Sequence, residues 1–329
     1  MRMLLRNLKN FFLNIIAYCI TRYYLRKPDK RDFLLTRLWS LKAIRKQFIN
    51  EIFFIASSSR SRYVTSLNIE ATNMCNLSCV ICPGQKEGTR QKGMMSMQLF
   101  EKIIVECGFI ELVQFSQWGE PLLHPQVYMM IDYAHRRGIK TFLTTNGILL
   151  GNGISLRLLE AGLDRITFSV DGIGSTYNKI RGASYNLLRN NILHFKKIRD
   201  SGGFDTKIDI SMVVCRDTEG EIGRLRTEFN TIADRIQFIP IFTHSKRKAK
   251  CRELWRGSLT VFWDGLVTPC CVDYEGRLVV GNIQKNNIKS IFNSSFMQKL
   301  RYLHARNRFP VPCDTCTEHV FGAVSPRFS

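Results

Sequence analysis

The feature that most constrains the fold of this chain is a regular alternation of short apolar segments with longer amphipathic ones. The short segments have the length and composition of strands, and the amphipathic ones have the spacing of helices. The expected strands cover residues 66–72, 112–117, 140–145, 165–170, 207–214 and 235–241. The expected helices cover residues 97–107, 126–137, 154–161, 185–200 and 219–232. This order predicts βαβ units that form one parallel sheet, an incomplete version of the eightfold α/β barrel.

Three cysteines stand directly after the first expected strand at the spacing C-x3-C-x2-C: Cys75, Cys79 and Cys82. Four cysteine thiolates fully ligate a four-iron cluster. Three of them leave one iron open, and an open iron can bind a second molecule, which the filled cluster of an electron carrier cannot do. The spacing therefore indicates a [4Fe–4S] cluster that takes part in chemistry at the carboxyl end of a strand.

Polar fragments also end the next three expected strands. They are Gly119 and Glu120 after the second strand, Asn146 after the third, and Ser169 and Asp171 after the fourth. Asn-Gly and Asp-Gly are turn dipeptides, so each fragment alone is equally well explained as an ordinary turn between a strand and a helix. With the cysteines they make four fragments in succession at strand ends, which favours one shared site.

The four fragments, taken in order, resemble the motifs of the radical S-adenosylmethionine (SAM) superfamily. The resemblance implies a partial (β/α)6 TIM-like barrel, a [4Fe–4S] cluster on the three cysteines, and SAM bound to the open iron. In this family the reduced cluster passes an electron to the sulfonium of SAM, and the C5′–S bond breaks. The 5′-deoxyadenosyl radical then removes an unactivated hydrogen atom from the substrate. A reductant such as flavodoxin or ferredoxin is implied as the partner that supplies the electron.

The resemblance also implies where SAM binds. Gly119 and Glu120 match the family's Gly-Gly-Glu motif, which holds the α-amino group, but Trp118 replaces the first glycine. Ile81 stands where the family often has an aromatic side chain facing adenine, and an aliphatic side chain can pack there too. Arg181 either pairs with an anionic group or lies in solvent beside a helix. The candidates near the ribose and carboxylate of SAM are Asn146, Ser169 and Asp171.

A second set of cysteines lies in the last part of the chain: Cys251, Cys270, Cys313 and Cys316. An expected hairpin over 259–270, with an Asp-Gly turn at Gly265, precedes a helical segment over 288–304. This pattern resembles the twitch domain, a shortened form of the SPASM domain, and implies one auxiliary [4Fe–4S] cluster on four thiolates. A structural zinc site is the rival interpretation, because C-x2-C pairs also bind zinc. The first cysteine motif favours iron–sulfur.

Four of the eleven cysteines remain outside both sets. Free cysteine is usually a small buried hydrophobe, which is the expectation for Cys19 and Cys107. Cys215 ends the fifth strand and Cys271 adjoins Cys270, so each is a candidate donor of a hydrogen atom to a substrate radical. Cys271 is also an alternative ligand to Cys270. Unpaired thiolates and clusters require a reducing compartment such as the cytoplasm, so we expect no disulfides.

The formal net charge is +21, and residues 1–62 carry +11 of it, from fourteen Lys and Arg against three acidic residues. Their apolar run at 11–20 is too short to span a bilayer. It also lacks the cleavage site of a signal peptide. Amphipathic spacing with basic flanks predicts either that residues 1–30 lie on the inner face of an anionic membrane or that they pack on the barrel. Basicity alone is not specific for nucleic acid, which is a weaker interpretation.

We expect three regions: a basic amphipathic helical extension over 1–62, the barrel over 63–245 and the auxiliary-cluster domain over 246–329. Similar enzymes with an auxiliary domain either modify peptides, often through a leader-binding domain, or oxidise and epimerise sugars and aminocyclitols. The first region lacks the strands of a leader-binding domain. The resemblance therefore favours oxidation or epimerisation of a carbohydrate, aminocyclitol or glycan-type substrate. The alternatives are a peptide-modifying maturase and a non-enzymatic electron-transfer protein.

Overall fold

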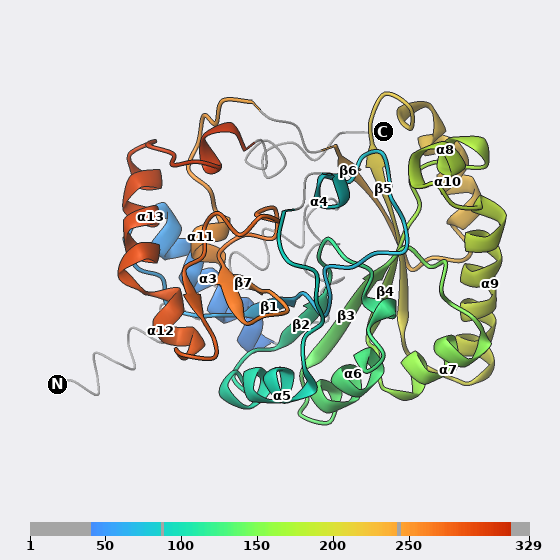
Figure 1. Cartoon of the computed structure of the whole chain (residues 1–329), viewed down its shortest axis with the longest axis horizontal. Helices are drawn as coiled ribbons and strands as arrows, with labels where there is room; N and C mark the ends of the chain where they lie inside the picture. The colour runs from blue at the N-terminus through green and yellow to red at the C-terminus, as the bar shows by residue number, and fades with distance from the viewer. Residues whose placement is uncertain (1–40, 87–88, 242–244, 317–329) are drawn as a thin grey trace.

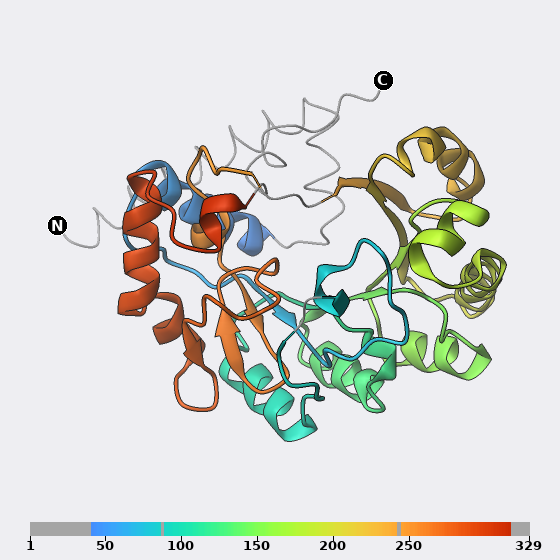
Figure 2. The ribbon, with the colours of Figure 1, turned by 45° about the horizontal axis from the view of Figure 1, so that its top comes forward.

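The computed structural model describes residues 41–86, 89–241 and 245–316, and its framework is one nine-stranded sheet. Six parallel strands follow one another in sequence order: β1 (Ser66–Ile69), β2 (Leu112–Phe115), β3 (Lys140–Thr145), β4 (Arg165–Ser169), β5 (Lys207–Val214) and β6 (Arg235–Pro240). Strand β6 lies at one edge of the sheet and does not pair with β1, so the barrel is open (Figure 1). The expected partial barrel is confirmed, and Figure 2 shows the open arc that the sheet and its helices form.

Helices follow the parallel strands and cover the outer face of the arc (Figure 1). Two of them begin at serine N-caps, Ser96 and Ser184, whose hydroxyls accept the backbone N–H three residues on. The helices of this region are α5 (Met97–Glu106), α6 (Val127–His135), α7 (Asn152–Glu160), α8 (Ser175–Arg181), α9 (Tyr185–Ser201) and α10 (Ile222–Phe229). Shorter elements are α4 (Pro83–Lys86), η1 (Pro121–Leu123) and η2 (Glu219–Glu221).

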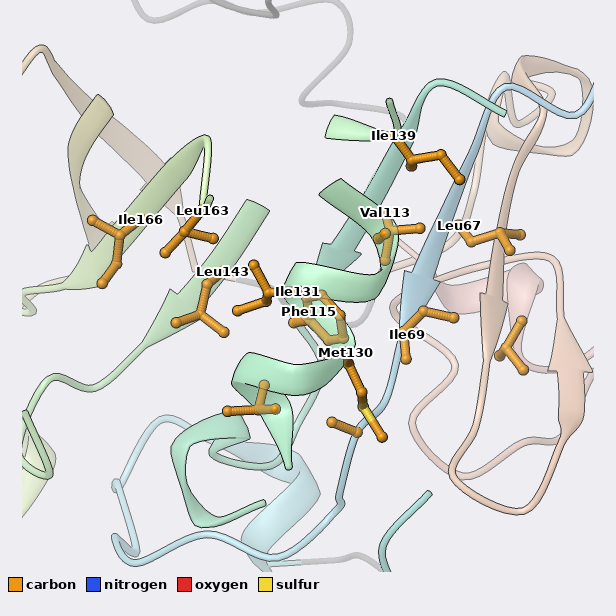
Figure 3. Packing of buried hydrophobic residues seen from close by; sticks show 14 of the residues in the cluster. Leu67, Ile69, Val113, Phe115, Met130, Ile131, Ile139, Leu143, Leu163 and Ile166 are labelled. Carbon is orange, nitrogen blue, oxygen red and sulfur yellow. The ribbon is translucent and has the colours of Figure 1, made fainter. Parts of the chain in front are cut away.

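The hydrophobic core fills the layer between the sheet and these helices. Figure 3 shows Phe115 of β2 beside Met130 and Ile131 of α6, and Leu67 of β1 and Ile166 of β4 belong to the same core cluster. Phe168 of β4 packs edge-on against Phe195 of α9, with the ring centroids 5.9 Å apart. Successive side chains of a strand point to opposite faces, so Thr167 and Ser169 lie on the inner face of the arc. The core also buries Cys107 completely, as expected of a small hydrophobe.

The last part of the chain continues the same sheet. Strand β7 (Ser258–Val261) pairs in parallel with β1, and β8 (Leu266–Thr268) and β9 (Gly281–Asn282) follow in antiparallel pairing. The expected hairpin is thus β7 and β8, and Gly265 in its turn has a φ of 86°, a conformation that favours glycine. The helical segment expected over 288–304 is two helices, α12 (Ile288–Phe292) and α13 (Ser295–Ala305), because Ser294 caps a new helix.

Helix α3 (Leu41–Ile55) packs against this last part of the chain. The ring of Phe54 meets Trp255 of α11 (Glu253–Arg256) edge-on at 5.5 Å. The Asn50 amide donates to the carbonyls of Tyr63 at 2.7 Å and Arg256 at 3.2 Å. Residues 1–30, where membrane contact is expected, lie outside the described residues. Within the described ranges, none of the helices has both the length and the apolar character needed to cross a membrane.

Candidate active site

The first cysteine set lies in the loop that follows the carboxyl end of β1. The backbone N–H of Val80 in this loop donates to the carbonyl of Ile180 near the end of α8, at 2.8 Å. The N–H of Cys82 donates to the carbonyl of Cys79 at 3.1 Å, which curls the loop before α4. The loop is therefore fixed against the end of a barrel helix, beside the strand ends where barrel chemistry is expected.

Arg181 and Asp171 form a pair that borders Cys79. The carboxylate of Asp171 accepts from Nε of Arg181 at 2.7 Å and from the backbone N–H of Val213 at 2.6 Å. Nη1 of Arg181 lies 3.9 Å from Sγ of Cys79. Burial raises the pKa of the Cys79 thiol, and the Arg181 guanidinium acts against that rise. Asp171 therefore positions a cation that favours the thiolate, the form that binds metal.

Asn146 borders Cys75 in a similar way. Its amide Nδ2 lies 3.9 Å from Sγ of Cys75 and donates to Oδ1 of Asn76 at 2.8 Å. The backbone N–H of Leu77 approaches the same sulfur at 3.5 Å. Burial raises the pKa of the Cys75 thiol, and the Leu77 N–H opposes the shift. Two cysteines of the set thus have N–H groups directed at sulfur, an environment that stabilises ligated thiolates.

The carboxylate of Glu120 is fully enclosed by donors from its own chain. It accepts from Oγ1 of Thr145 and the N–H of Asn146, each at 2.8 Å, and from the N–H of Leu122 at 3.1 Å. Burial raises the pKa of Glu120, and the N–H groups of Asn146 and Leu122 oppose the rise. The side chain therefore joins the end of β2 to the end of β3, and through Asn146 it supports the loop of the first cysteines.

Gly119 occupies a place that no side chain can share. A Cβ on this residue would lie 2.1 Å from the carbonyl oxygen of Thr72 and 2.8 Å from that of Met74. The N–H of Glu120 donates to the same Met74 carbonyl at 2.8 Å. The backbone after β2 therefore packs directly against the start of the cysteine loop, and only glycine permits this approach.

The remaining candidates differ in their surroundings. Ser169 is half-buried at the end of β4 and aligns with Ser211 of β5 on the inner face. Cys215 follows β5 in a turn, where its N–H donates to Oγ1 of Thr218 at 2.9 Å and its sulfur lies 3.7 Å from that oxygen. Cys271 is exposed, directly after Cys270. The hydrogen bond between these adjacent thiols raises the pKa of Cys270, and its burial adds to the effect.

The four cysteines of the second set come from three places near the last strands of the sheet. Cys251 precedes α11, and its backbone N–H donates to Nδ1 of the buried His304 at 3.2 Å. Cys270 follows β8, Cys313 begins the turn η3 (Cys313–Thr315), and Cys316 follows that turn. Burial raises the pKa of the Cys251 thiol to about 12, and that of the Cys313 thiol likewise to about 12. Nearby Arg247 opposes both shifts.

Sequence reasoning missed Arg247, because a lone arginine in a loop carries no motif. It is 3% exposed, and its Nε donates to the carbonyl of Cys313 at 3.0 Å. Its Nη1 donates to the carbonyl of Ala249 at 3.1 Å. Reasoning from sequence also left Arg181 open between an anionic partner and solvent; the structure pairs it with Asp171.

Beside the cysteines, two buried polar atoms have no hydrogen-bond partner within the part of the chain that the structure describes, and this bears on whether iron–sulfur clusters fit the site. The hydroxyl of Tyr177, close to Arg181 and Cys79, has no hydrogen-bond partner in the described chain. Nε2 of His304, beside Cys251, likewise has none there. Buried polar groups normally have partners, so each atom suits a bound group that carries acceptor atoms. Among the described residues, no three His, Cys, Asp or Glu side chains surround a single metal-ion position; cluster cysteines bind separate irons.

Comparisons with protein families agree with both cysteine sets. The sequence model described as the radical SAM superfamily matches residues 69–228. The model of SPASM, described as an iron–sulfur cluster-binding domain, matches residues 251–317. A curated relative from Pyrococcus furiosus, a tungsten-containing aldehyde ferredoxin oxidoreductase cofactor-modifying protein, is 32% identical over 117 residues, 35% of this chain. The chain spans about a third of the length of the curated relatives of this kind.

Solved structures share the fold at low sequence identity. BtrN in complex with AdoMet and 2-DOIA aligns with a TM-score of 0.53 at 16% identity, over 78% of this chain and 94% of that one. Streptococcus suis SuiB bound to the precursor peptide SuiA aligns with a TM-score of 0.61 at 13% identity, over 80% of this chain and 72% of that one. At such identities the likeness concerns the fold alone.

Proposed function

This chain is a member of the radical SAM superfamily with a C-terminal SPASM-type iron–sulfur domain, and from that premise we propose that it removes a hydrogen atom from a carbohydrate, aminocyclitol or glycan-type substrate. The two domains imply [4Fe–4S] clusters and bound SAM. The reaction is an oxidation or an epimerisation. The cytoplasm, a reducing compartment, is the proposed location, with flavodoxin or ferredoxin as reductant.

The residues proposed to hold the first cluster are Cys75, Cys79 and Cys82. When bound, the cluster and SAM supply the one-electron cleavage of SAM that yields the 5′-deoxyadenosyl radical. The chain's own part is to keep two of these thiols ready for deprotonation, through Arg181 at Cys79 and the N–H groups at Cys75. Thiolates, not thiols, are the ligating form, so these donors favour loading of the site.

The residues assigned to SAM divide into two kinds. Gly119 offers backbone next to the cysteine loop, so it remains the candidate for the amino group. Glu120 and Asp171 act on SAM through other residues in this proposal, because chain donors engage both carboxylates. Asn146 and Ser169 stay as candidates for direct contact, since both lie at strand ends on the side of the site.

The observation that carries the substrate class is the polar character of the inner face of the sheet. Aligned positions on this face hold buried or half-buried polar side chains: Asn68, Gln114, Thr144, Thr167, Ser211 and Gln237. Some bond to one another, as where Nε2 of Gln114 donates to Oδ1 of Asn68 at 3.1 Å. Phe142 aligns with Gln114 and adds an aromatic surface to the same face. Hydroxyl-rich ligands need such convergent polar groups beside some apolar area.

In this proposal the two reaction types differ in what happens to the substrate radical, and only the epimerisation needs a thiol donor such as Cys215 or Cys271. In an oxidation the substrate radical loses a further electron, and the second cluster, on Cys251, Cys270, Cys313 and Cys316, is the proposed acceptor. In an epimerisation a thiol returns a hydrogen atom to the substrate instead. Cys271 is the better placed donor, because its side chain is exposed whereas Cys215 is half-buried in a turn.

The experiment that tests the proposal measures 5′-deoxyadenosine from the reconstituted protein with SAM and dithionite under anaerobic conditions. A panel of C-deuterated hexoses, aminocyclitols and short peptides is added, and deuterium transfer into 5′-deoxyadenosine is followed by mass spectrometry. We expect transfer from a polyol and not from peptides. Transfer from peptides alone would make the chain a peptide-modifying enzyme. The absence of any SAM cleavage would leave only electron transfer.

Matched variants of the inner face sharpen this test. T167V and S211A each remove one hydroxyl without changing the backbone. We expect the KM for the polyol to rise by roughly five- to tenfold, because a hydrogen bond contributes about 1 kcal/mol or somewhat more to binding. Substrate-free cleavage of SAM should stay at the parent level. An unchanged KM in both variants would argue against substrate binding on this face.

A further inference from the structure

Arg247 lies among the cysteines of the second set, although it belongs to none of the motifs. Its guanidinium bonds to the carbonyl of Cys313, and its backbone N–H donates to the carbonyl of Asp314 at 2.7 Å. The side chain also faces the ring of Phe309, with the guanidinium carbon 5.8 Å from the ring centroid. These contacts fix a buried cation beside η3 and the segment before α11.

The electrostatics identify which groups this cation faces. The hydrogen bond to the Cys313 carbonyl holds the guanidinium at the second cysteine set, and its electrostatic partners there are Cys251, Cys316 and Cys313. Three of the four proposed ligands therefore interact with one positive charge. An isolated buried guanidinium is costly, so the site is built for negative charge at this position.

The first cysteine set contains a contrasting arginine. Arg181 also approaches a cysteine sulfur, but it forms an ion pair with Asp171, which is fully buried. The guanidinium of Arg247 donates to the carbonyls of Cys313 and Ala249, and it also forms a hydrogen bond with the Cys316 side chain. The positive charge near the first set is thus balanced by a carboxylate, whereas the contacts of Arg247 leave its charge directed to the cysteines.

We propose that Arg247 is a positioning residue that raises the reduction potential of the auxiliary cluster above the value it would otherwise have. The proposal rests on the proposed function, because it assumes a cluster on the second cysteine set. Reduction adds one negative charge to a cluster, and a fixed neighbouring cation stabilises that charge. Net charge, hydrogen bonds to sulfur and low solvent exposure are the factors that set cluster potentials. A raised potential suits a cluster that accepts an electron from an oxidised substrate.

The test uses a background in which only the auxiliary cluster is present. The triple variant C75A/C79A/C82A of the full chain removes the first cluster, so the remaining EPR signal belongs to the second. Its midpoint potential is measured in an anaerobic redox titration, without SAM or substrate. In this background R247Q should shift the reduction equilibrium toward the oxidised form at least tenfold, a fall of about 59 mV for a one-electron couple. R247K keeps the charge but loses the forked donors, so its potential should fall less.

Two controls separate this effect from general ones. R301Q removes another buried arginine of the same region, whose guanidinium bonds to the carbonyls of Leu254 and Phe292. K248Q removes one positive charge from the exposed neighbour of Arg247. Both controls should leave the potential within a few millivolts of the parent, because the Arg301 guanidinium is held by carbonyls outside the cysteine set and the exposed charge of Lys248 is screened by solvent.

Each outcome has a distinct meaning. If the triple variant binds no iron, the auxiliary cluster and with it the proposed function fail before Arg247 is tested. If R247Q holds about four irons and its potential equals that of the parent, the role of Arg247 is refuted. If R247Q loses its iron, R247K decides: a lowered potential supports the proposal, and an unchanged one opposes it. If the midpoint potential falls equally in R301Q, the change results from loosened packing rather than from the charge of Arg247, and the proposal is overturned.

Discussion

The indole Nε1–H of Trp118 donates a hydrogen bond to the backbone carbonyl of Cys271, with a nitrogen–oxygen distance of 3.0 Å. The same indole meets the ring of Tyr274 edge-on at 5.4 Å. A Cβ on Gly84, two residues after the last cysteine of the first set, would lie 2.8 Å from Cβ of Trp118. One side chain thus joins the two cysteine regions, at a position where the family more often has glycine.

Replacing Trp118 by Phe keeps a ring near Tyr274 but removes the hydrogen bond to Cys271. A neutral hydrogen bond contributes about 1 kcal/mol, which corresponds to roughly a fivefold change in the opening of the turn around Cys271. We expect iodoacetamide to alkylate Cys271 faster by about that factor, with iron content unchanged. W118G also removes the ring and should accelerate the reaction further. Equal rates in the parent and W118F would contradict a link through this bond.

Replacing Cys75, Cys79 and Cys82 together by Ala should remove about half of the bound iron, from about eight to about four irons per chain. SAM cleavage should be abolished, because no open iron remains. Iron analysis and 5′-deoxyadenosine assays measure both effects, and C107A, a change in the core, serves as the control. A triple variant that still cleaves SAM would exclude these cysteines as ligands. Zinc in place of the remaining iron would exclude the auxiliary cluster.

Changing Cys313 and Cys316 to Ala should stop product formation while leaving some abortive SAM cleavage. The reason is that the second set serves substrate turnover, and only the first set leaves an iron open. In this assay C271A and C215A distinguish the reactions: a dehydrogenase should tolerate both, and an epimerase should lose turnover with one. Normal product formation by protein shown to lack the auxiliary cluster would refute its role.

The stability of the protein should depend on pH through Glu120. Its pKa is raised in the folded state, so the folded protein binds this proton more tightly than the unfolded chain does. The stabilisation is therefore fully present below the unfolded pKa and is lost as pH rises through the folded pKa. E120Q, which cannot titrate, should show a flatter dependence of Tm on pH over that range. An identical slope in the parent and E120Q would show that another group is responsible.

At a fixed pH near neutrality, E120Q should also lower stability by about 1–3 kcal/mol. The amide group of Gln would face donors from Leu122, Thr145 and Asn146, and at least one of them would lose its acceptor. Urea denaturation of the reconstituted protein measures the loss. E101Q, a change on the exposed side of α5, is the matched control and should lie near the parent value.

Deleting residues 1–30 should abolish binding to anionic vesicles at low salt while SAM cleavage continues. The apolar face and the basic flanks of this segment supply both contributions to membrane affinity. Sedimentation with phosphatidylglycerol vesicles measures binding, and neutral phosphatidylcholine vesicles are the control. If the full-length protein does not sediment with anionic vesicles, residues 1–30 pack on the barrel instead of binding a membrane.

Local patterns predicted the parallel strands, because each combines an apolar run with a following turn fragment. The expected strand at 66–72 is shorter in the structure, Ser66–Ile69, since the chain leaves the sheet to approach Gly119. Helix α8 was not predicted: its seven residues lie between two glycines, Gly174 and Gly182, and carry little periodic signal. Strand lengths and short helices depend on contacts that a local pattern does not contain.

Site residues divide in the same way. Cys75 and its neighbours were recognisable because a metal-binding loop places its ligands close together in sequence. Two of the donors to Glu120 come from the end of β3, and the contact of Arg247 with Cys313 joins segments more than sixty residues apart. The role of Asp171 in holding Arg181 follows from the turn between β4 and α8, and spacing alone does not reveal it.

The parallel pairing of β7 with β1 fixes the register between the barrel and the last part of the chain. Ser66 to Ile69 align residue by residue with Ser258 to Val261; Cys75 lies in the loop after β1, and Cys270 follows β8, the antiparallel neighbour of β7. A shift by one residue would turn every β7 side chain to the wrong face, so slippage is prohibited by the core. The relative position of the two regions is therefore set by the backbone hydrogen bonds of one sheet rather than by a hinge.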